Sequence, residues 1–572
     1  MLKLLRLAKP YWPMVLLGPI MMMVEVLSEL VQPRLMASIV DKGIARGDLM
    51  YIMRTGGIML LVAIGGMLFG LGMIIVSSNA SQRYGADLRR AVFSKVMRLP
   101  TPDLDKFRSG SLITRLTSDV TQMQQLLMIL MRMLVRAPML CFGSIAMATS
   151  MSPSLSRVFW VAVPVLFALM WVIQRLDRVN TVLQENLAGV RVNRAFGRSD
   201  YEIERFGVEN TALETSSVEA ARVMGIFDPV MAFGMNLTIV LVVWLGGDMV
   251  NTVLPDGTSA FTVGQMMAFI SYTTQILFAL VRNGVLVNAI ARSKASANRI
   301  NQVMETVPQF SDPTEPLANR IADGRVEFKD VSFRYPTASG DPVLRDVSFV
   351  AEPGRTTAII GTTGSGKSTL VSLIPRLYDV LSGSVLIDGV DVRDYKIEEL
   401  RSGIGMVMQD TVLFSGQVQD NLRWGRADVG TDHMREAARA AEADDFISRL
   451  PNGYASELGQ RGSGLSGGQK QRLGIARALI RKPKILILDD ATSAVDMGTE
   501  ARIQEALRNK DWTCTTLVIA QRVSSVMDAD QIIVLDDGRI TGKGTHKELI
   551  SNNAIYREIV QSQFGKEAIS NG

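Results

Sequence analysis

A chain of 572 residues is too long for a single domain of ordinary size, so two or more domains are expected. Hydrophobic residues make up 47% of it, and its mean hydropathy of +0.19 is high for a soluble protein. The formal charge of +5 would suit nucleic-acid binding, but positive loops beside membrane helices explain it better, and no nucleic-acid partner is expected. The two cysteines, Cys141 and Cys514, provide no disulfide framework and are expected to be free thiols.

The apolar residues gather before about Val287, which predicts a membrane half followed by a soluble half. A spanning helix needs roughly 20 mostly apolar residues. No small-residue cleavage site follows the first apolar run, so that run is expected to be a retained helix. Six spans are expected, the fourth being the shortest, at residues 12–33, 55–77, 127–149, 158–173, 224–245 and 262–287.

Loop charges predict how these spans are oriented. Lys3, Arg6 and Lys9 precede the first span, and the two long segments after spans two and four are rich in arginine and lysine. Residues 246–261, between spans five and six, contain neither. The positive-inside rule therefore places both termini and the two long loops in the cytoplasm, where the spans are expected to continue as helical extensions.

Several ionisable residues lie within or near the expected spans, where charge is expensive and usually faces a cavity. Glu25 and Glu29 are four residues apart and therefore share a helix face. One interpretation is that these residues line a path for cationic substrates. The alternative is that they lie near the water interface or pair with a partner subunit. The residues concerned are Glu25, Glu29, Arg132, Arg136, Asp228 and Arg282.

The soluble half begins after a linker rich in Pro, Asp and Asn, residues 307–324. In it, "TTAIIGTTGSGKSTLVSLI" gives a β-branched strand, a glycine loop and the start of a helix. Residues 361–368 match the pattern G-x-x-x-x-G-K-[ST] in the strand–loop–helix context that a P-loop requires. Backbone N–H groups of such a loop cradle phosphates, Lys367 would reach the β/γ-phosphates and Ser368 would ligate Mg²⁺. The pattern predicts nucleotide binding.

A second glycine turn precedes another helix. The residues "LSGGQ" are followed at once by "KQRLGIARALI", which has the pattern of a helix. This makes a second anion-binding helix N-terminus, which the chain's own P-loop does not need and which a phosphate bound by another subunit could use. Its residues are Leu465, Ser466, Gly467, Gly468 and Gln469.

These motifs, in this order, resemble those of the ATP-binding cassette (ABC) family. "LSGGQ" resembles the signature motif, Asp489 the Walker B aspartate, Gln409 the Q-loop glutamine and Tyr335 the A-loop aromatic that stacks on adenine. Residues 493–496, "SAVD", resemble the D-loop, and residues 457–462 resemble the segment that family exporters place near the coupling loops. Residues 107–120 and 183–198 resemble the two cytoplasmic coupling regions of six-helix exporters, so the resemblance covers nearly the whole chain.

The resemblance implies an α-helical transmembrane domain at residues 1–306, a linker at 307–324 and an α/β P-loop nucleotide-binding domain at 325–572. It implies ATP and Mg²⁺ as cofactors, a second half-transporter as partner, and a bacterial plasma membrane as the location. The implied metal ligands are Ser368, Gln409 and Asp489. The implied nucleotide-binding residues are the five of "LSGGQ" together with Tyr335, Gly361, Thr362, Thr363, Gly364, Ser365, Gly366, Lys367, Ser368, Thr369 and Gln409.

Two positions that bear on catalysis depart from the family pattern. Asp490 stands where the family has a glutamate that polarises the attacking water, and its side chain is one methylene shorter. Gln521 stands in place of the switch histidine; it can hydrogen-bond a phosphate but cannot carry the charge of an imidazole. The chain's two histidines, His433 and His546, lie elsewhere and are no ready substitute. Positioned general-base help is worth about 10²–10⁴-fold, so ATP binding with poor hydrolysis is expected.

This combination resembles the degenerate-site subunit of bacterial heterodimeric multidrug exporters of hydrophobic or amphipathic compounds. It predicts a different partner chain, carrying the glutamate and the histidine, whose site is completed by this chain's "LSGGQ". The alternatives are a homodimeric exporter with a slow ATPase and a regulatory or gating ABC subunit. Six spans argue against a soluble ABC protein, and the union of both domains in one chain argues against an importer. The segment after span four is shorter than the family pattern leads us to expect.

Overall fold

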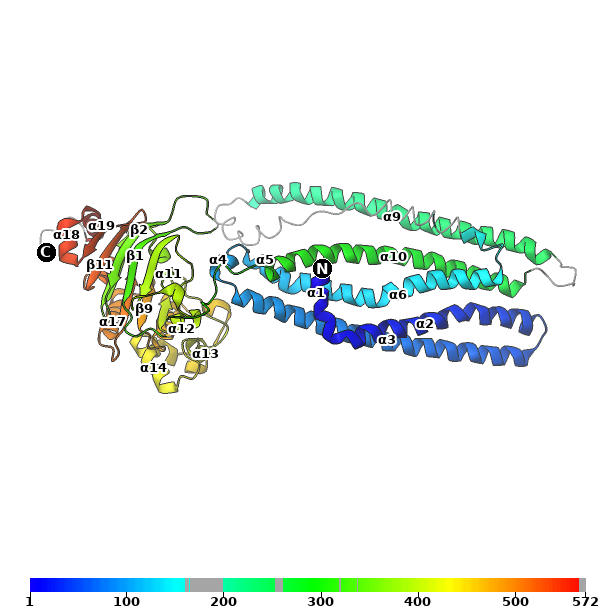
Figure 1. Cartoon of the computed structure of the whole chain (residues 1–572), viewed down its shortest axis with the longest axis horizontal. Helices are drawn as coiled ribbons and strands as arrows, with labels where there is room; N and C mark the ends of the chain where they lie inside the picture. Colours follow the sequence, from blue (N-terminus) through cyan, green and yellow to red (C-terminus); the bar gives the residue numbers. More distant parts are fainter. Residues whose placement is uncertain (160–163, 165–198, 253–260, 318–319, 337, 565–572) are drawn as a thin grey trace. The chain divides into compact units, whose positions relative to one another are not determined.

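The chain folds as two units. The computed structural model describes residues 1–159, 164, 199–252, 261–317, 320–336 and 338–564 (Figure 1). The first unit consists of Met1–Met97 and Ser109–Thr306, and the second of Arg98–Arg108 and Val307–Gly572. The chain therefore crosses from one unit to the other three times, after residues 97, 108 and 306.

Long helices build the first unit, because its apolar runs extend over many turns (Figure 1). At about 1.5 Å per residue, the 50 residues of α3 are roughly 75 Å long, far more than the ~30 Å of a bilayer's hydrocarbon core. The prediction that the spans continue as helical extensions is thus confirmed for α3. The helices are α1 (Leu2–Leu5), η1 (Arg6–Tyr11), α2 (Trp12–Ser38), η2 (Ile39–Ile44), α3 (Leu49–Arg98), α5 (Ser109–Thr114), η3 (Arg115–Asp119), α6 (Val120–Met151), α9 (Ser199–Asn251) and α10 (Val263–Met304).

Helices α2, α6 and α10 share one buried apolar cluster, to which Val26, Phe269 and Ile276 belong. Polar contacts fix the approach of α10 to α2. The Tyr272 hydroxyl donates to the carbonyl oxygen of Leu30 at 2.8 Å. At the start of α10, a capping box between Thr262 and Gln265 satisfies the first backbone N–H groups.

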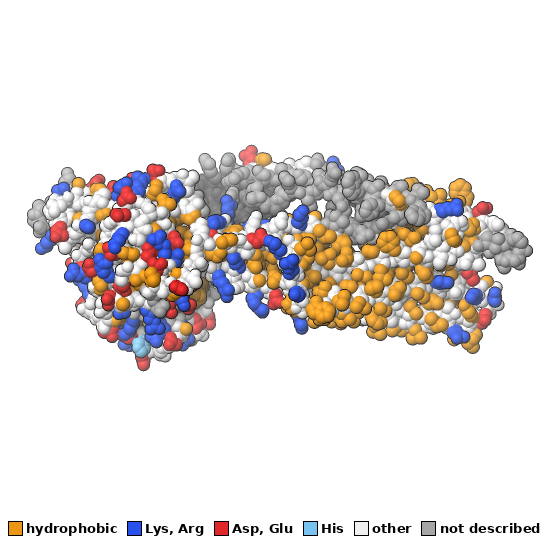
Figure 2. Space-filling model, in the orientation of Figure 1, with side chains coloured by type: hydrophobic (Ala, Val, Ile, Leu, Met, Phe, Trp, Pro, Cys, Tyr) orange, Lys and Arg blue, Asp and Glu red, His pale blue; other side chains and the backbone are white. Residues whose placement is uncertain are grey.

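Four helical stretches among the described residues are long and apolar enough to cross a membrane: Leu2–Ile44, Leu49–Arg98, Ser109–Met151 and Ala232–Val250. They correspond to expected spans one, two, three and five. Span six lies in α10, and most of span four lies outside the described residues. Figure 2 shows the surface that suits this location, a broad field of hydrophobic side chains over the helices; Leu60, Leu61 and Leu68 of α3 contribute to it.

The described residues of the second unit form three sheets. A six-stranded sheet has the order β12-β11-β3-β10-β9-β6, in which only β12 runs antiparallel to its neighbour. An antiparallel sheet has the order β2-β1-β4-β5, and β7 pairs with β8. The strands are β1 (Val326–Phe333), β2 (Leu344–Ala351), β3 (Thr356–Gly361), β4 (Ser382–Ile387), β5 (Val390–Asp391), β6 (Ile404–Val407), β7 (Gly416–Gln417), β8 (Glu457–Leu458), β9 (Ile485–Asp489), β10 (Thr515–Ile519), β11 (Gln531–Asp536) and β12 (Arg539–Gly544).

The parallel strands end where the sequence motifs begin. β3, β9 and β10 are neighbours or next neighbours, and ligands in open α/β sheets bind outside the carboxyl ends of such strands. The helices of this unit are α4 (Thr101–Leu104), α11 (Lys367–Ser372), η4 (Val392–Asp394), α12 (Ile397–Ser402), α13 (Val418–Arg423), α14 (Thr431–Ala440), α15 (Asp444–Ser448), η5 (Gly453–Ala455), η6 (Gln460–Gly462), α16 (Gly467–Leu479), α17 (Met497–Arg508), η7 (Val523–Ser525), α18 (His546–Asn552) and α19 (Ala554–Phe564).

Candidate nucleotide site

The loop between β3 and α11 forms the first wall of the site. An added Cβ at Gly361 would lie 1.9 Å from the carbonyl oxygen of Leu535, so a side chain does not fit there. Gly364 and Gly366 have φ angles of 86° and 99°, in the left-handed region that favours glycine. Successive N–H groups in such a loop form a concavity that accepts an anion, as the sequence predicted.

Lys367 begins α11 and folds back over this loop. Its Nζ donates to the carbonyl oxygens of Gly361 at 3.0 Å and Thr362 at 2.7 Å. Burial lowers the pKa of Lys367, whereas the neighbouring carboxylates of Asp489 and Asp490 act in the opposite direction. The ammonium group thus lies where a phosphate chain bound by the loop would need a cation.

The predicted metal ligands meet at the end of β9. The Ser368 hydroxyl donates to Oδ1 of Asp489 at 2.9 Å, and Gln409 lines the same cavity. Burial raises the pKa of Asp489, and the hydrogen bond from Ser368 partly offsets this shift. Hydroxyl, carboxylate and amide oxygens are hard ligands of the kind that Mg²⁺ takes together with phosphate oxygens. Beside them, Oγ of Ser365 is buried without a hydrogen-bond partner among the described residues, so the donor set fits a magnesium nucleotide.

Asp490 follows Asp489 and is 8% exposed. Its Oδ2 accepts a hydrogen bond from Nε2 of Gln521 at 2.8 Å and a longer one from Nε2 of Gln409 at 3.4 Å. Burial raises the pKa of Asp490, and the hydrogen bond from Gln521 opposes that shift. The two departures from the family pattern therefore contact each other directly.

These residues line a cavity of about 400 Å³. Sequence reasoning missed Val343, Ile519, Ile559 and Gln563, which also line it. Gln563 donates from Nε2 to the carbonyl oxygen of Gln521 at 2.7 Å and accepts from the backbone N–H of Val523 at 2.8 Å. No local signal marks Gln563, because it lies on the C-terminal helix α19 and reaches the site only through the fold. The predicted residues in the lining are Gly361, Thr362, Thr363, Gly364, Gly366, Lys367, Ser368, Thr369, Gln409, Asp489, Asp490 and Gln521.

Tyr335 lies beside this lining rather than in it. Its hydroxyl is 2.9 Å from Oγ1 of Thr369, which belongs to the lining, and its ring makes edge contacts with Phe333 and Tyr378. Tyr335 is thus attached to the helix that follows the P-loop. An adenine ring bound at the P-loop would have Tyr335 as an aromatic neighbour.

The signature motif lies at the N-terminus of α16, outside the described lining of the P-loop cavity. Ser466 caps this helix in a capping box with Gln469. Gln471 connects α16 to the D-loop, because its side chain donates to the Ser493 hydroxyl at 3.0 Å and accepts from the Ala494 N–H at 2.9 Å. Residues 465–469 therefore do not belong to the lining of this chain's own P-loop cavity.

Other sequence predictions fall elsewhere. His546 hydrogen-bonds the Tyr556 hydroxyl at 2.7 Å and His433 is exposed on α14, so neither histidine lines the cavity. Cys141 and Cys514 are buried free thiols. Of the first expected coupling region, residues 107–120, only residues 107 and 108 belong to the second unit. The other region, 183–198, and the segment after span four lie outside the described residues.

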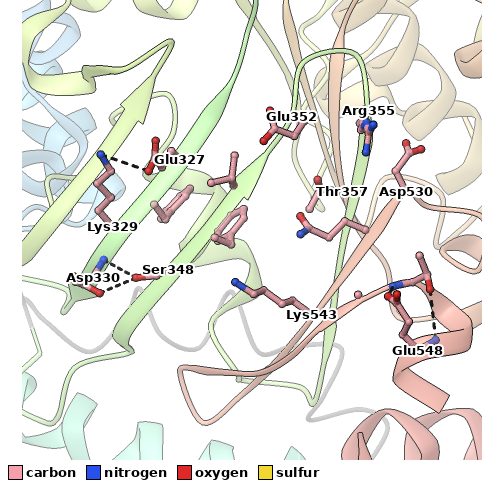
Figure 3. A pocket seen from close by; sticks show the side chains of 16 residues that line it. Glu327, Lys329, Asp330, Ser348, Glu352, Arg355, Thr357, Asp530, Lys543 and Glu548 are labelled. Atoms are coloured by element: carbon pink, nitrogen blue, oxygen red, sulfur yellow. Dashed lines mark hydrogen bonds and ion pairs between the residues drawn. The ribbon is translucent and has the colours of Figure 1, made fainter. Parts of the chain in front are cut away.

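A larger hollow, of about 510 Å³, lies over β1, β2, β11 and β12 (Figure 3). Charged side chains of both signs line it. Lys329 pairs there with Glu327, and Ser348 with Asp330. None of the predicted nucleotide-binding residues belongs to this lining, so the smaller P-loop cavity is the candidate site.

In the first unit, charged side chains of α2 and α6 pair with each other. Arg136 of α6 donates to Oε1 of Glu25 at 2.5 Å and to Oε2 of Glu29 at 2.8 Å, both on α2. Together with α3 these residues line an open cavity of about 500 Å³. Arg132 instead donates to the Ser77 hydroxyl at 3.2 Å. The side chains of Asp228 and Arg282 are outside the described part of the chain.

The sequence matches the ABC transporter family over residues 344–493 and the ABC transporter transmembrane region over residues 15–280. It is 41% identical over 581 residues to the uncharacterized ABC transporter ATP-binding protein YfiB of Bacillus subtilis, an alignment that covers 99% of each chain. It is 37% identical over 489 residues to the fatty acid ABC transporter ATP-binding/permease protein of Mycobacterium tuberculosis, covering 83% of this chain and 76% of that one.

Among solved structures, a bacterial Atm1-family ABC exporter with ATP bound has a TM-score of 0.79 and 26% sequence identity, with 98% of each chain covered. A similar fold thus occurs in an exporter whose structure was solved with ATP bound. The chain belongs to the ABC transporter family and is an exporter half-transporter, in which one transmembrane region and one ATP-binding domain share a single chain.

Proposed function

We propose that this chain is one half of an ATP-driven exporter of hydrophobic or amphipathic compounds of the multidrug type. Its own site binds Mg-ATP and hydrolyses it poorly, and its signature motif completes the site of a different partner chain. The observation that carries the proposal is the contact between Asp490 and Gln521. The two residues that replace the family's catalytic pair hydrogen-bond each other.

The reason lies in what a general base must offer. A base activates water through a free lone pair within hydrogen-bond reach of that water. Oδ2 of Asp490 accepts two amide hydrogen bonds, from Gln521 and Gln409, which hold the carboxylate in place. Oδ1 keeps its lone pairs, but the side chain is one methylene shorter than the family's glutamate, so the carboxylate stands farther from the water. Gln521 supplies no positive charge to a departing phosphate. The P-loop, Lys367 and Ser368 remain intact, so the site is expected to bind ATP although it hydrolyses ATP slowly.

A cavity in the first unit supports this substrate class. The cavity between α2, α3 and α6 combines Glu25, Glu29 and Arg136 with the apolar side chains of Met67 and Leu71. Such a mixture suits a molecule with both a polar and an apolar part. A relative with 37% identity is named a fatty acid transporter, and a fatty acid is also amphipathic.

The domain limits and topology belong to the same proposal: a transmembrane domain at 1–306, a linker at 307–324, and a nucleotide-binding domain at 325–572. Both termini and this domain face the cytoplasm. The Lys and Arg content of the long loops supports this orientation. The bacterial relatives support a plasma membrane location.

The test is Asp490→Asn, which keeps the size of the side chain and removes its charge. ATP turnover by the exporter assembled with its partner chain is expected to stay close to that of the native protein, while removal of the partner's Walker B glutamate stops it. The same change in exposed Asp432 of α14 serves as the matched control. Rapid ATP hydrolysis by the isolated homodimer, abolished by Asp490→Asn, would make Asp490 the working base and refute the proposal.

A regulatory or gating subunit predicts a different result in the same preparation. An exporter's ATPase rises when its transported compound is added, because binding in the membrane unit promotes turnover. A gating subunit has no such substrate. ATPase that no amphipathic compound stimulates, in the assembled complex, would favour the gating alternative.

A further inference from the structure

One side chain that belongs to no motif holds two backbone groups of the nucleotide site. Gln563 lies in the last turn of α19. Its Oε1 accepts a hydrogen bond from the backbone N–H of Val523 at 2.8 Å, and its Nε2 donates to the carbonyl oxygen of Gln521 at 2.7 Å. Both polar atoms of one amide are thus bound to residues 521–523, called here the 521–523 segment. Because Val523 is fully buried, its N–H needs this acceptor.

Helix α19 is itself held by contacts away from the nucleotide cavity. Tyr556 is fully buried, and its hydroxyl lies 2.7 Å from Nδ1 of His546. Val560, one turn further on, is 2% exposed and belongs to the same apolar cluster as Tyr556. Ile559 and Gln563 are four residues apart, share a face of the helix and both line the P-loop cavity. The packing of α19 therefore fixes where the amide of Gln563 stands.

The residues that follow Gln521 are also held from the opposite side, by α17. Glu500 is 6% exposed, and its Oε1 accepts from the Ser525 hydroxyl at 2.6 Å. Its Oε2 lies 3.6 Å from Nη1 of Arg522. Neither contact involves the backbone of Gln521, which Gln563 holds. The two helices thus divide the work, and the position of the Gln521 backbone depends on α19.

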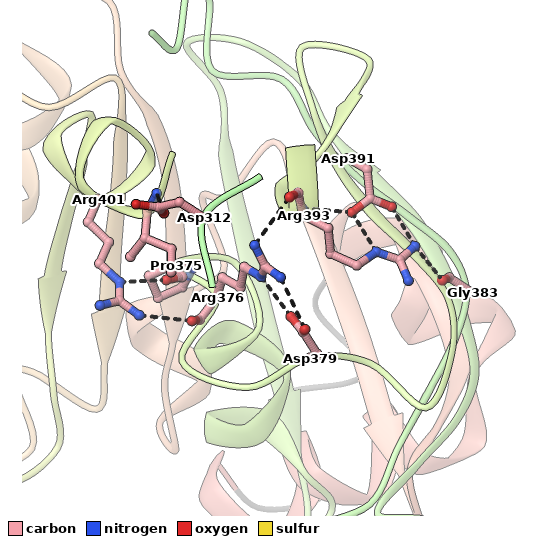
Figure 4. A network of polar contacts seen from close by, with 9 residues as sticks. Asp312, Pro375, Arg376, Asp379, Gly383, Asp391, Arg393 and Arg401 are labelled. Atoms are coloured by element: carbon pink, nitrogen blue, oxygen red, sulfur yellow. Dashed lines mark hydrogen bonds and ion pairs between the residues drawn. The ribbon is translucent and has the colours of Figure 1, made fainter. Parts of the chain in front are cut away.

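A side chain that binds two neighbouring backbone groups fixes the course of a loop. Arg401 does this elsewhere in the same unit, where it donates to the carbonyl oxygens of Pro375 and Arg376, each at 2.9 Å (Figure 4). Arg376 has a φ angle of 49°, in a region that residues other than glycine seldom adopt. The clamp from Arg401 thus holds a backbone conformation that would otherwise relax. We expect the clamp from Gln563 to act on the 521–523 segment in the same way.

The side chain of Gln521 points from this segment into the nucleotide site. Its Nε2 donates to Oδ2 of Asp490 at 2.8 Å, beside Asp489, which accepts from Ser368. In nucleotide sites Mg²⁺ is held by one or two carboxylates together with phosphates of the substrate. The Gln521 amide therefore lies next to the residues that would hold the metal and, with it, the terminal phosphate of ATP.

We propose that Gln563 is a positioning residue for the distinction between ATP and ADP. Through the backbone of the 521–523 segment it keeps the Gln521 amide where it can donate to the terminal phosphate, which ADP lacks. Helix α19 thereby contributes to nucleotide selection although it carries none of the motifs. The inference rests on the proposed function only in that the P-loop cavity binds ATP, and it does not depend on how fast ATP is hydrolysed.

The test uses the full-length chain in lipid nanodiscs. Its affinities for a non-hydrolysable ATP analogue and for ADP are measured in the same preparation. Gln563→Met keeps the length of the side chain and removes both hydrogen bonds. The ratio of the two affinities is expected to fall about fivefold, the effect of one neutral hydrogen bond, with the affinity for ADP unchanged. Gln561→Met is the matched control, because Gln561 is exposed on the same helix and does not line the cavity.

A double variant separates positioning from a purely structural role. Gln521→Ala removes the side chain that is positioned and should lower the ratio by itself. Adding Gln563→Met should then cause no further fall, because nothing is left to position. Three results would overturn the proposal: a native ratio in Gln563→Met, a further fall in the double variant, or a native chain that does not favour the ATP analogue over ADP. A native chain that binds neither nucleotide would refute the proposed function as well.

Discussion

At the scale of single residues, Lys367 is the group on which nucleotide binding depends most directly. Its ammonium lies over the P-loop through hydrogen bonds to two carbonyl oxygens. Lys367→Ala should weaken ATP binding at this site by about 10–100-fold, the range expected when a hydrogen bond to a charged group is lost. Titration of the full-length chain with a fluorescent ATP analogue measures this. Lys396→Ala, an exposed lysine before α12, should leave the affinity unchanged; equal effects of both variants would count against the P-loop assignment.

Asp490 should also influence stability in a way that depends on pH. Because burial raises its pKa in the folded chain, the folded state favours the protonated form. The contribution of Asp490 to the stability of the folded chain is therefore fully present below the ordinary Asp pKa of about 3.9. It is lost as the pH rises through the raised pKa of the folded state. Asp490→Asn should raise the Tm of the nucleotide-free chain at neutral pH, and the gain should shrink on acidification. A gain that grows on acidification would contradict this sign.

Individual site residues could be predicted from the sequence only where they belong to a motif. The P-loop residues could be predicted because their spacing follows from phosphate binding. The bond between Gln521 and Asp490 could not, because it joins residues 31 apart that meet only after β9 and β10 pair in parallel. Gln563 has no motif at all and enters the site from the last described helix.

At the scale of elements, α16 presents the signature motif away from the chain's own cavity. An added Cβ at Gly468 would lie 2.6 Å from the carbonyl oxygen of Ala494 in the D-loop. Gly468→Val should therefore remove most turnover of the assembled exporter while ATP still binds to this chain's P-loop. Gly430→Val, before α14, is the control because nothing lies within 4 Å of its added Cβ. Full ATPase in Gly468→Val would refute the proposed role of the motif in the partner's site.

Helix α3 approaches α2 closely at its glycines. An added Cβ at Gly70 would lie 3.0 Å from Cδ of Glu25, so Gly70→Leu should displace that carboxylate and fill part of the cavity. Transport of amphipathic compounds, measured with proteoliposomes of the assembled exporter, should fall while ATP binding stays the same. Gly65→Leu on the same helix meets no atom within 4 Å and should transport normally. Unchanged transport by Gly70→Leu would remove this cavity from the substrate path.

The elements themselves were largely predictable, because long apolar runs and the alternation of strands are local signals. The docking of residues 98–108 was not. The sequence resemblance pointed to residues 107–120, but the segment is held by Asp103 and Asp105, whose partners Gln309 and Tyr378 lie more than 200 residues away. A carboxylate in a polar loop gives no sequence signal of the group that will bind it.

At the scale of the whole molecule, the proposed exporter is asymmetric. In this proposal one P-loop would hold ATP with little hydrolysis while the partner's site turns over, so the two sites would act at different moments of the cycle. Composition and motif order predicted both units and the family. They could not identify the transported compound, because the cavity of the membrane unit depends on which faces of α2, α3 and α6 come together.

The division of the chain into units also bears on its biosynthesis. Residues 98–108 emerge from the ribosome early, but Tyr378, which binds Asp105, follows 273 residues later. At about 5–20 residues per second, the segment waits roughly 15–55 seconds for its partner. During this time the Asp103 carboxylate, fully buried in the finished fold, has no partner from the linker. Maturation of the ATP-binding unit therefore has to follow insertion of the first two membrane helices, and a soluble fragment that starts at Val307 lacks a piece of its own fold.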